Sequence, residues 1–291
     1  IEILEILSPG ILTSIQDLGR YGYGRYGVAP SGALDSFALR IANLLVGNRS
    51  DQAALEITLL GPAIRALADI VVAVTGGNLQ PRRNKQPIEM WRSHILKKDD
   101  ILSFDLPLSG FRAYVAAGGG ISAPLVMGSR STNLSSGFGG LQGRTLEKND
   151  ILTSENHSQH VKRDTRAFNT AWIPVYPNNW SLRVIWGPQD DHFPDESRDS
   201  FLSATYKMSS DSDRTGIRLQ GSVIRQKPDM QASIISEGVI AGSVQIPGDG
   251  KPIIILGETV TGGYRKIATV ISADLPLLGQ IKPGDAVRFK A

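Results

Sequence analysis

The chain has no cysteine among its 291 residues. That absence excludes disulfides, thiolate metal ligands and a cysteine nucleophile. Lys and Arg number 31 against 28 Asp and Glu, and they form no dense basic tract, so nucleic-acid binding is not expected. The longest aliphatic runs, at residues 70–74 and 252–256, are far shorter than the ~18 apolar residues of a membrane span. We therefore expect a cytoplasmic protein without a membrane partner.

Several signatures of catalysis and cofactor attachment are also missing. The chain contains no G-x-S-x-G elbow, Walker A loop or H-E-x-x-H sequence. None of the four methionines precedes a lysine, so no Met-Lys-Met-like biotin attachment site is present. Residues 22–27 match G-x-G-x-x-G, but residues 28–32 stand where a helix should begin, and no βαβ series follows. This match therefore does not indicate a dinucleotide fold.

Glycine and proline are abundant, at 31 and 16 residues, and they separate many short apolar segments. Short strands with frequent turn signals are typical of β-barrels. The order glycine, strand, small turn, acid and strand occurs in both halves: residues 110–115, 121–128 and 146–152 resemble residues 263–268, 271–279 and 281–287. We therefore predict a mainly β protein with two similar domains, residues 1–165 and 166–291.

The junction between the halves is a polar, irregular stretch at residues 154–179, which we interpret as a linker. His157 and His160 lie in it three residues apart, and no third ligand is evident, so no metal site is expected. Asp190-Asp191-His192 is interpreted as a loop before a short helix at residues 194–202.

The clearest helix prediction covers residues 35–46, which Asp35 can cap. Its predicted buried face consists of Phe37, Ile41, Leu44 and Leu45. Residues 88–104 are predicted to form a hairpin. Glu56 lies in an apolar strand, where its carboxylate is expected either on the solvent face or toward a pocket.

The strongest chemical pattern is the segment at residues 212–221, in which two arginines flank a glycine. In an extended chain Arg214, Gly216 and Arg218 would share a face, and the glycine would leave room for another group to approach the backbone. Two guanidinium groups on one face suit a carboxylate, a phosphate or an amide oxygen. The alternative is a strand whose arginines are solvated or paired with the neighbouring aspartates.

A variant of the motif at residues 212–221 occupies residues 16–25 in the first half. The glycine- and serine-rich segments at residues 128–132 and 137–144 could form anion-binding nests or ordinary tight turns. Together these segments fit the orientation of a small polar substrate and the stabilisation of charge on its amide oxygen. They identify no nucleophile.

Seven short sequence motifs, spread over nearly the whole chain, resemble those of a known family. They are residues 13–20, 27–35, 42–48, 128–132, 212–219, 236–239 and 261–264. These motifs resemble the biotin-dependent carboxyltransferase family, which contains the C subunit of 5-oxoprolinase, kinase-inhibitor antagonists and an allophanate-hydrolase-type module of urea carboxylase. The first half departs from the family's usual acidic glycine turns at residues 98–100 and 148–150, which affects only the expected turn shape.

The resemblance implies tandem cyclophilin-like β-barrel domains with a few short helices. It also implies two protein partners, the B-like and A-type components of a 5-oxoprolinase, of which the B-like protein resembles a sporulation kinase inhibitor. Such a complex is expected to open 5-oxo-L-proline, a small cyclic amide, to L-glutamate with ATP as co-substrate.

The resemblance also directs attention to individual residues. Arg214 and Arg218 are hypothesised to clamp an oxyanion or a carboxylate, with Asp213 orienting them and Glu237 acting as a base. The expected substrate-binding residues are Arg20, Asp35, Ser129, Arg130, Ser131, Gln245, Thr261 and Tyr264.

Two other functions stay open on the sequence. A carboxyltransferase would move a carboxyl group from carboxybiotin, carried by another protein, to a urea-like amide. A non-catalytic antagonist would bind a sporulation-kinase inhibitor and need no catalytic residues.

Overall fold

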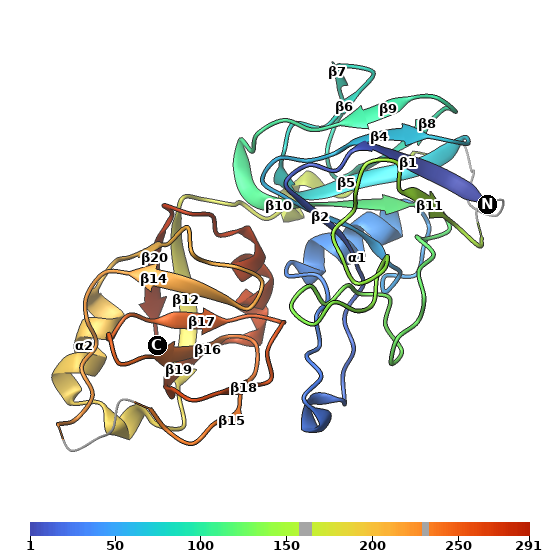
Figure 1. The fold of residues 1–291 in the computed structure, drawn as a ribbon. Helices are drawn as coiled ribbons and strands as arrows, with labels where there is room; N and C mark the ends of the chain where they lie inside the picture. Colours follow the sequence, from blue (N-terminus) through green and yellow to red (C-terminus); the bar gives the residue numbers. More distant parts are fainter. Residues whose placement is uncertain (157–164, 229–232) are drawn as a thin grey trace. The chain divides into compact units, whose positions relative to one another are not determined.

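The computed structural model describes residues 1–156, 165–228 and 233–291, and most of its regular elements are strands (Figure 1). The prediction of a mainly β protein is confirmed. His157 and His160 lie outside the described residues. Within those residues, no helix combines the length and hydropathy needed to cross a bilayer.

The chain divides into two compact units. Unit 1 contains Ile1–Tyr21 and Ser31–Tyr176, and unit 2 contains Gly22–Pro30 and Pro177–Ala291. A short segment of the N-terminal half therefore belongs to the second unit. The domain limits inferred from the sequence, 1–165 and 166–291, stay a prediction.

Unit 1 consists of two antiparallel sheets. The first has the order β11-β1-β4-β9-β6-β7, and its strands are β1 (Glu2–Ser8), β4 (Ala63–Ala66), β6 (Arg82–Arg83), β7 (Gln86–Pro87), β9 (Ile101–Ser103) and β11 (Ile151–Thr153). The second has the order β2-β3-β10-β5-β8, and its strands are β2 (Leu12–Gln16), β3 (Ala54–Thr58), β5 (Ile70–Asn78), β8 (Arg92–Leu96) and β10 (Ser109–Ala117). The predicted hairpin at residues 88–104 is wrong, because β8 and β9 belong to different sheets.

The core of unit 1 draws on both sheets. It includes Ile3 and Ile64 from the first sheet and Ile57, Val72 and Val115 from the second, all fully buried. Strands β5 and β10 are buried on both faces, because α1 (Ser36–Leu45) packs against them (Figure 1). Burial on both faces explains their uninterrupted apolar sequences.

Helix α1 begins where the sequence predicts, and the Asp35 carboxylate accepts a hydrogen bond from the Ala38 amide. The predicted buried face is only partly correct. Ala38, Leu39 and Ala42 are buried, whereas Leu44 is 50% exposed. Leu45 of the predicted face is buried as well, but alanines make up part of the buried face and Leu44 does not belong to it, so the large apolar residues alone do not define it. The 3-10 helix η3 (Thr170–Trp172) lies near the C-terminal limit of unit 1.

Unit 2 is a closed barrel with the order β12-β19-β16-β17-β14-β13-β20. Its strands are β12 (Asn179–Trp186), β13 (Tyr206–Met208), β14 (Gly216–Gln220), β16 (Ser243–Ile246), β17 (Ile253–Ile255), β19 (Arg265–Val270) and β20 (Ala286–Lys290). The parallel pair β12–β20 joins the two ends of the barrel. Alternate residues point inward, as Leu182 and Val184 in β12 and Val287 and Phe289 in β20 illustrate.

Short helices and a two-stranded ribbon complete unit 2. The helices are α2 (Asp195–Ser203), as predicted for residues 194–202, and the 3-10 segments η1 (Gly24–Tyr26), η4 (Asp190–His192) and η5 (Ser272–Gln280). Phe201 of α2 stacks on Phe289 with ring centroids 4.4 Å apart. The ribbon pairs β15 (Glu237–Gly238) with β18 (Thr261–Gly262).

Candidate functional site

Asp17, just after β2, gathers three of the predicted substrate-binding residues of unit 1. Its carboxylate accepts hydrogen bonds from Ser129 Oγ at 2.6 Å, Ser131 Oγ at 2.5 Å and the Arg130 amide at 2.6 Å. The Gly19 amide also donates to it, at 2.7 Å. The serine-rich turn therefore forms the anion-binding arrangement that its sequence predicts, but in this structure it binds the protein's own carboxylate.

Arg20 is buried beside this carboxylate and forms hydrogen bonds with several surrounding loops. Its guanidinium donates to Ser31 Oγ at 3.1 Å, to the Val126 carbonyl at 3.3 Å and to the Ser131 carbonyl. The Phe138 ring lies 4.8 Å from its central carbon. Because Arg20 is only 2% exposed, its N–H groups are used in hydrogen bonds to the loops of unit 1. We call Asp17, Arg20 and Ser129–Ser131 the Asp17 cluster.

Asp35 belongs to a second buried network in unit 1. Its carboxylate accepts from Tyr176 Oη at 3.0 Å, while its amide donates to Tyr114 Oη at 2.8 Å. Tyr114 Oη donates in turn to Glu56 at 2.7 Å, and the Leu34 amide donates to the same carboxylate oxygen at 2.9 Å. Glu56 is fully buried, which excludes the solvent-face alternative. Burial, with the nearby carboxylates, raises the pKa of Tyr114 well above its usual value, so the phenol stays a donor.

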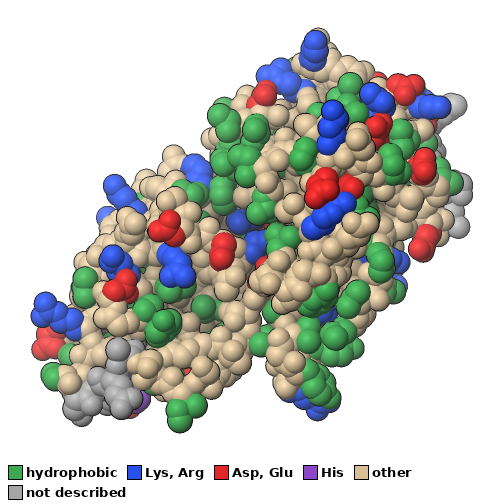
Figure 2. Space-filling model, in the orientation of Figure 1, with side chains coloured by type: hydrophobic (Ala, Val, Ile, Leu, Met, Phe, Trp, Pro, Cys, Tyr) green, Lys and Arg blue, Asp and Glu red, His purple; other side chains and the backbone are tan. Residues whose placement is uncertain are grey.

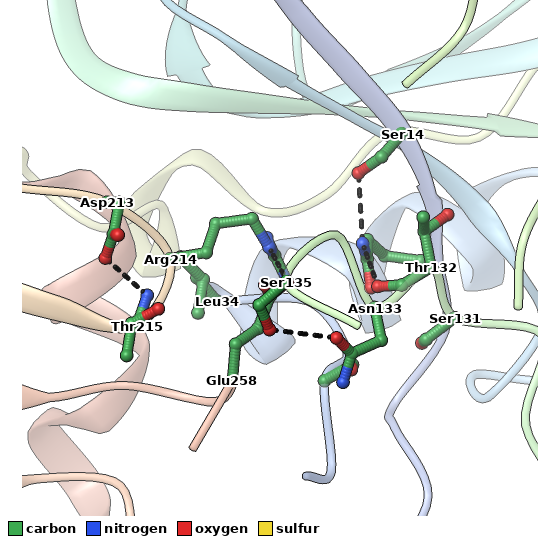
Figure 3. Close-up of polar contacts among 12 residues, drawn as sticks. Ser14, Leu34, Ser131, Thr132, Asn133, Ser135, Asp213, Arg214, Thr215 and Glu258 are labelled. Atoms are coloured by element: carbon green, nitrogen blue, oxygen red, sulfur yellow. Dashed lines mark hydrogen bonds and ion pairs between the residues drawn. The ribbon is translucent and has the colours of Figure 1, made fainter. Parts of the chain in front are cut away.

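In unit 2, Asp213 and Arg214 lie in the turn that leads into β14 (Figure 3). The Asp213 carboxylate accepts from the amides of Thr215 at 2.7 Å and Gly216 at 3.1 Å, so it fixes the turn that carries Arg214. Arg214 Nε donates to Glu258 Oε1 at 2.7 Å, and both side chains are buried (Figure 3). The buried pair carries no net charge, which makes its burial possible.

Arg218 has different surroundings from Arg214. It lies within β14 and is exposed, whereas Arg214 precedes the strand and is 3% exposed. The prediction that they share one face is therefore wrong, because the two-residue alternation begins only at Gly216. Another group does approach the backbone at Gly216, and it is strand β17, because a Cβ there would lie 3.2 Å from the Ile254 carbonyl oxygen.

Glu237, on the β15–β18 ribbon, is bound by Lys266 of β19. Lys266 Nζ and Gln189 Nε2 both donate to Glu237 Oε1, the latter at 2.6 Å. Gln189 Oε1 also accepts from the Lys266 amide at 3.0 Å. The hydrogen bond from Lys266 holds the pKa of the Glu237 carboxyl below its usual value. Glu237 is therefore an anion at neutral pH, and a weak base.

Gln245 and Thr261 lie beside this pair. Gln245 is opposite Lys266 in the β16–β19 register, and its Nε2 donates to the Tyr264 carbonyl at 3.2 Å. Thr261 pairs with Gly238 across the ribbon. A Cβ at Gly262 would lie only 2.3 Å from Gln245 Nε2, so the glycine lets the ribbon approach the barrel. We call Glu237, Lys266, Gln189 and Gln245 the Glu237 cluster.

Two predicted residues, Arg218 and Tyr264, line a cavity of about 280 Å³ in unit 2. We call it the Arg218 pocket. Its other polar lining residues include Ser209, Asp211, Asp249 and Lys251. The predicted residues of unit 2 thus fall into three places: the turn with Asp213 and Arg214, the Glu237 cluster and the Arg218 pocket.

Charged side chains of both signs are mixed on the face of the molecule drawn in Figure 2. On the face in Figure 2, Lys and Arg side chains are dispersed among acidic and uncharged ones. Specific pairs at short distance, rather than a broad potential of one sign, therefore govern the electrostatics on this face.

Comparison with known proteins shows to which family this sequence is similar. Residues 26–291 match the family described as carboxyltransferase domain, subdomain A and B. The chain is 38% identical to the 5-oxoprolinase C subunit of Escherichia coli K12 over 289 residues, covering 99% of this chain and 90% of that protein. It is 32% identical to the 5-oxoprolinase C subunit of Haemophilus influenzae over 290 residues, covering 99% and 91%.

The chain belongs to the carboxyltransferase-domain family. Its resemblance to that family in sequence is confirmed. The solved structure of the Kluyveromyces lactis urea carboxylase matches with a TM-score of 0.92 and 34% identity, over 99% of this chain and 27% of the yeast chain. This chain thus spans about a quarter of that larger protein.

Several residues of this carboxyltransferase-domain chain were not predicted as site residues. Lys266, Gln189 and Glu258 are the partners of predicted residues, and each comes from a distant segment. A lysine inside the apolar strand at residues 265–270 is the one signal that could have drawn attention to Lys266. Gln189 and Glu258 lie in loops, and nothing in their local sequence marks them.

Metal binding finds no support in the described part of this family member. Residues 1–156, 165–228 and 233–291 contain no group of three or more His, Asp or Glu side chains that could hold an ion. His192 Nδ1 accepts a hydrogen bond from Arg265 Nε at 2.9 Å. Asp190–His192 precedes α2 as predicted, but it forms the 3-10 helix η4 and not an irregular loop.

Proposed function

We propose that this chain is the C subunit of an ATP-dependent 5-oxoprolinase, which opens 5-oxo-L-proline to L-glutamate together with the A and B components of the complex. The observation that carries the proposal is the 38% identity to the E. coli C subunit, which extends over 90% of that protein. The complex would be cytoplasmic, and this chain would contribute to turnover only with its partners present.

The proposed reaction consumes 5-oxoproline, ATP and water and releases glutamate, ADP and phosphate. A lactam is a poor electrophile, because its nitrogen lone pair is delocalised into the carbonyl group, and its nitrogen is also a poor leaving group. Transfer of the γ-phosphoryl group to the lactam oxygen would activate the ring carbon for attack by a first water. Collapse of that adduct would break the C–N bond, protonate the amine and leave an acyl phosphate, which a second water would hydrolyse to glutamate and phosphate. Fixed cations and amides would stabilise the negative charge that develops on the oxygens.

Reconstitution tests the proposal directly. The three purified proteins are mixed with 5-oxo-L-proline and ATP, and released glutamate is measured. We expect glutamate only in the complete mixture, and none when ATP, this chain or either partner is omitted. Absence of glutamate from the complete mixture would overturn the proposal.

Carboxyl transfer is a second candidate, because the structure of this chain matches the urea carboxylase with a TM-score of 0.92. In that reaction a urea nitrogen gains the carboxyl group and carboxybiotin recovers a proton. Since the chain has no biotin attachment site of the Met-Lys-Met type, free carboxybiotin is the appropriate donor. Labelled carboxyl transferred to urea by this chain alone would favour this candidate. Tight binding to the B-like partner without turnover in any mixture would favour the antagonist hypothesis.

Glu237 provides a test at the level of one residue. We propose that it holds Lys266 and the β15–β18 ribbon in place, since its lowered pKa makes it a weak base between pH 6 and 9. Glu237→Gln is expected to lower turnover by about tenfold, or ~1.4 kcal/mol, at every pH in that range. The matched control is Glu196→Gln, on the exposed surface of α2. Equal turnover in both variants would remove Glu237 from the proposed site.

A further inference from the structure

The Arg218 pocket contains two cations without local partners. Arg218 projects from β14, and Lys251 lies in the turn between β16 and β17. Neither the Arg218 guanidinium nor the Lys251 ammonium has a hydrogen bond or an ion pair within the described residues, in contrast to Arg214 and Lys266. Two unpaired cations lining one cavity favour an anionic group, and a carboxylate matches the guanidinium fork.

Two acids line the same cavity and are held by local turns. Asp211 accepts from Ser209 Oγ at 3.3 Å, and Asp249 accepts from the Lys251 amide at 3.1 Å. Each of these donors is a neutral group, so these bonds pair neither acid with a cation. The lining therefore presents charges of both signs, which suits a ligand with a carboxylate at one end and an N–H donor at the other.

The size of the pocket limits the ligand further. At about 280 Å³ it lies near the lower end of the ~300–1,000 Å³ of small-molecule sites. The two carboxylates would repel a polyphosphate, and this repulsion discriminates against a nucleotide. Tyr264, which is 39% exposed, also lines the pocket, and an aromatic side chain at this place suits packing against a small saturated ring.

We propose that the Arg218 pocket binds an α-amino acid or its lactam. Arg218 and Lys251 would bind the carboxylate, and Asp211 and Asp249 would face the ammonium group or the lactam N–H. This assignment deepens the proposed 5-oxoprolinase function and rests on it for the choice of 5-oxo-L-proline and L-glutamate as ligands. The class of ligand itself follows from the charges and the size of the pocket.

Calorimetric titration of the full chain tests this assignment. The probes are 5-oxo-L-proline, L-glutamate, inorganic phosphate and urea, each added separately. We expect 5-oxoproline or glutamate to bind, and Arg218→Ala to weaken that binding at least tenfold. Arg218→Lys should weaken it less, because a lysine keeps the charge but loses the planar fork. The matched control is Lys290→Ala, an exposed cation on β20 that does not line the pocket.

Each outcome decides the assignment. Binding that survives both Arg218→Ala and Lys251→Ala would overturn it, and so would the failure of both amino-acid probes to bind. Phosphate binding alone would replace it with a simple oxyanion site. Urea bound in place of the amino-acid probes would also contradict it. Since Arg218 is exposed and unpaired among the described residues, its variants should keep the wild-type unfolding midpoint.

The proposed reaction and the proposed pocket can fail separately. If the complete complex produces glutamate and Arg218→Ala leaves its KM unchanged, the pocket assignment fails while the function stands. If the complex produces no glutamate but the chain binds 5-oxoproline through Arg218, the function fails while the pocket assignment stands.

Discussion

At the scale of single residues, buried carboxylates hold several turns of this protein in place by accepting hydrogen bonds. Asp17 accepts four hydrogen bonds in unit 1, and Glu258 pairs with Arg214 in unit 2. A hydrogen bond to a charged group contributes ~1.5–3 kcal/mol, about twice as much as one between neutral groups. These acids therefore fix the turns on which the predicted site residues lie.

Replacement of Asp17 by asparagine tests this role. The amide keeps one acceptor oxygen but turns an NH₂ group toward the hydroxyl and amide donors, so buried donors lose their acceptor. We expect Asp17→Asn to lower the free energy of unfolding by about 3 kcal/mol, measured by urea denaturation at neutral pH.

The control for this substitution is Asp99→Asn. Asp99 is exposed and has φ near +72°, a conformation that asparagine adopts readily. Asp99→Asn should change the free energy of unfolding by less than about 0.5 kcal/mol. Similar losses in the two variants would contradict the role assigned to Asp17.

At the scale of elements, the β15–β18 ribbon depends on a close approach to the barrel. Glu237 reaches Lys266 from this ribbon, and Gly262 lies against the Gln245 side chain. A glycine is required here because of the neighbouring side chain, since its φ is not in the left-handed region. Gly262 in the segment Thr261-Gly262-Gly263-Tyr264 is therefore needed for packing against Gln245, in addition to being part of the family resemblance.

Gly262→Ala should displace Gln245, because the new Cβ would lie 2.3 Å from Gln245 Nε2. The displaced amide loses its bond to the Tyr264 carbonyl, and we expect a cost of about 1–3 kcal/mol in the free energy of unfolding. The effect is measured by urea denaturation.

The same ribbon supplies the control. A Cβ at Gly238 meets nothing within 4 Å, so Gly238→Ala should be nearly neutral. In the Gln245→Ala background, Gly262→Ala should cost less, and a double-mutant cycle reports that coupling. Additive costs would mean that Gly262 and Gln245 do not restrict one another.

At the scale of the whole molecule, both units contain acids and phenols whose pKa values differ from their usual values. Hydrogen bonds from Arg144 hold the pKa of Asp150 in unit 1 below its usual value, as Lys266 does for Glu237 in unit 2. Burial raises the pKa of Tyr114 and of Tyr176 in unit 1. Folding therefore favours the ionised acids and the neutral phenols.

The pH dependence of stability follows from these directions. The acids contribute stability above their unfolded pKa values, ~3.9 for Asp and ~4.3 for Glu, and that stability is lost as the pH falls through their folded values. The phenols contribute stability below ~10, and it is lost as the pH rises above that value. We expect the urea midpoint to be nearly constant from pH 5 to 9 and to fall on both sides.

Asp150→Asn should reduce the fall in the urea midpoint on the acid side only. Its matched comparison is Asp99→Asn, whose side chain is exposed. A wild-type midpoint at pH 3 equal to that at pH 7 would contradict the prediction.

Much of the fold could be predicted from local sequence. Turn residues between short apolar runs predict the strands, and Asp35 before a helical pattern predicts the start of α1, because caps and alternation depend on neighbours in the chain. The buried face of α1 and the placement of β8 and β9 in different sheets were not predictable in this way, because both depend on which distant surfaces pack together.

The sequence by itself determined the mainly β class, the membership of a family and the segments in which site residues lie, because those depend on residue types in order along the chain. Only the tertiary structure decided that residues 129–131 bind Asp17, that Arg214 is buried and Arg218 exposed, and that Lys266 holds Glu237. The physical reason is that the electrostatics of a charged group depend on its burial and on its partners, and these partners lie 29 to 114 residues away in the chain.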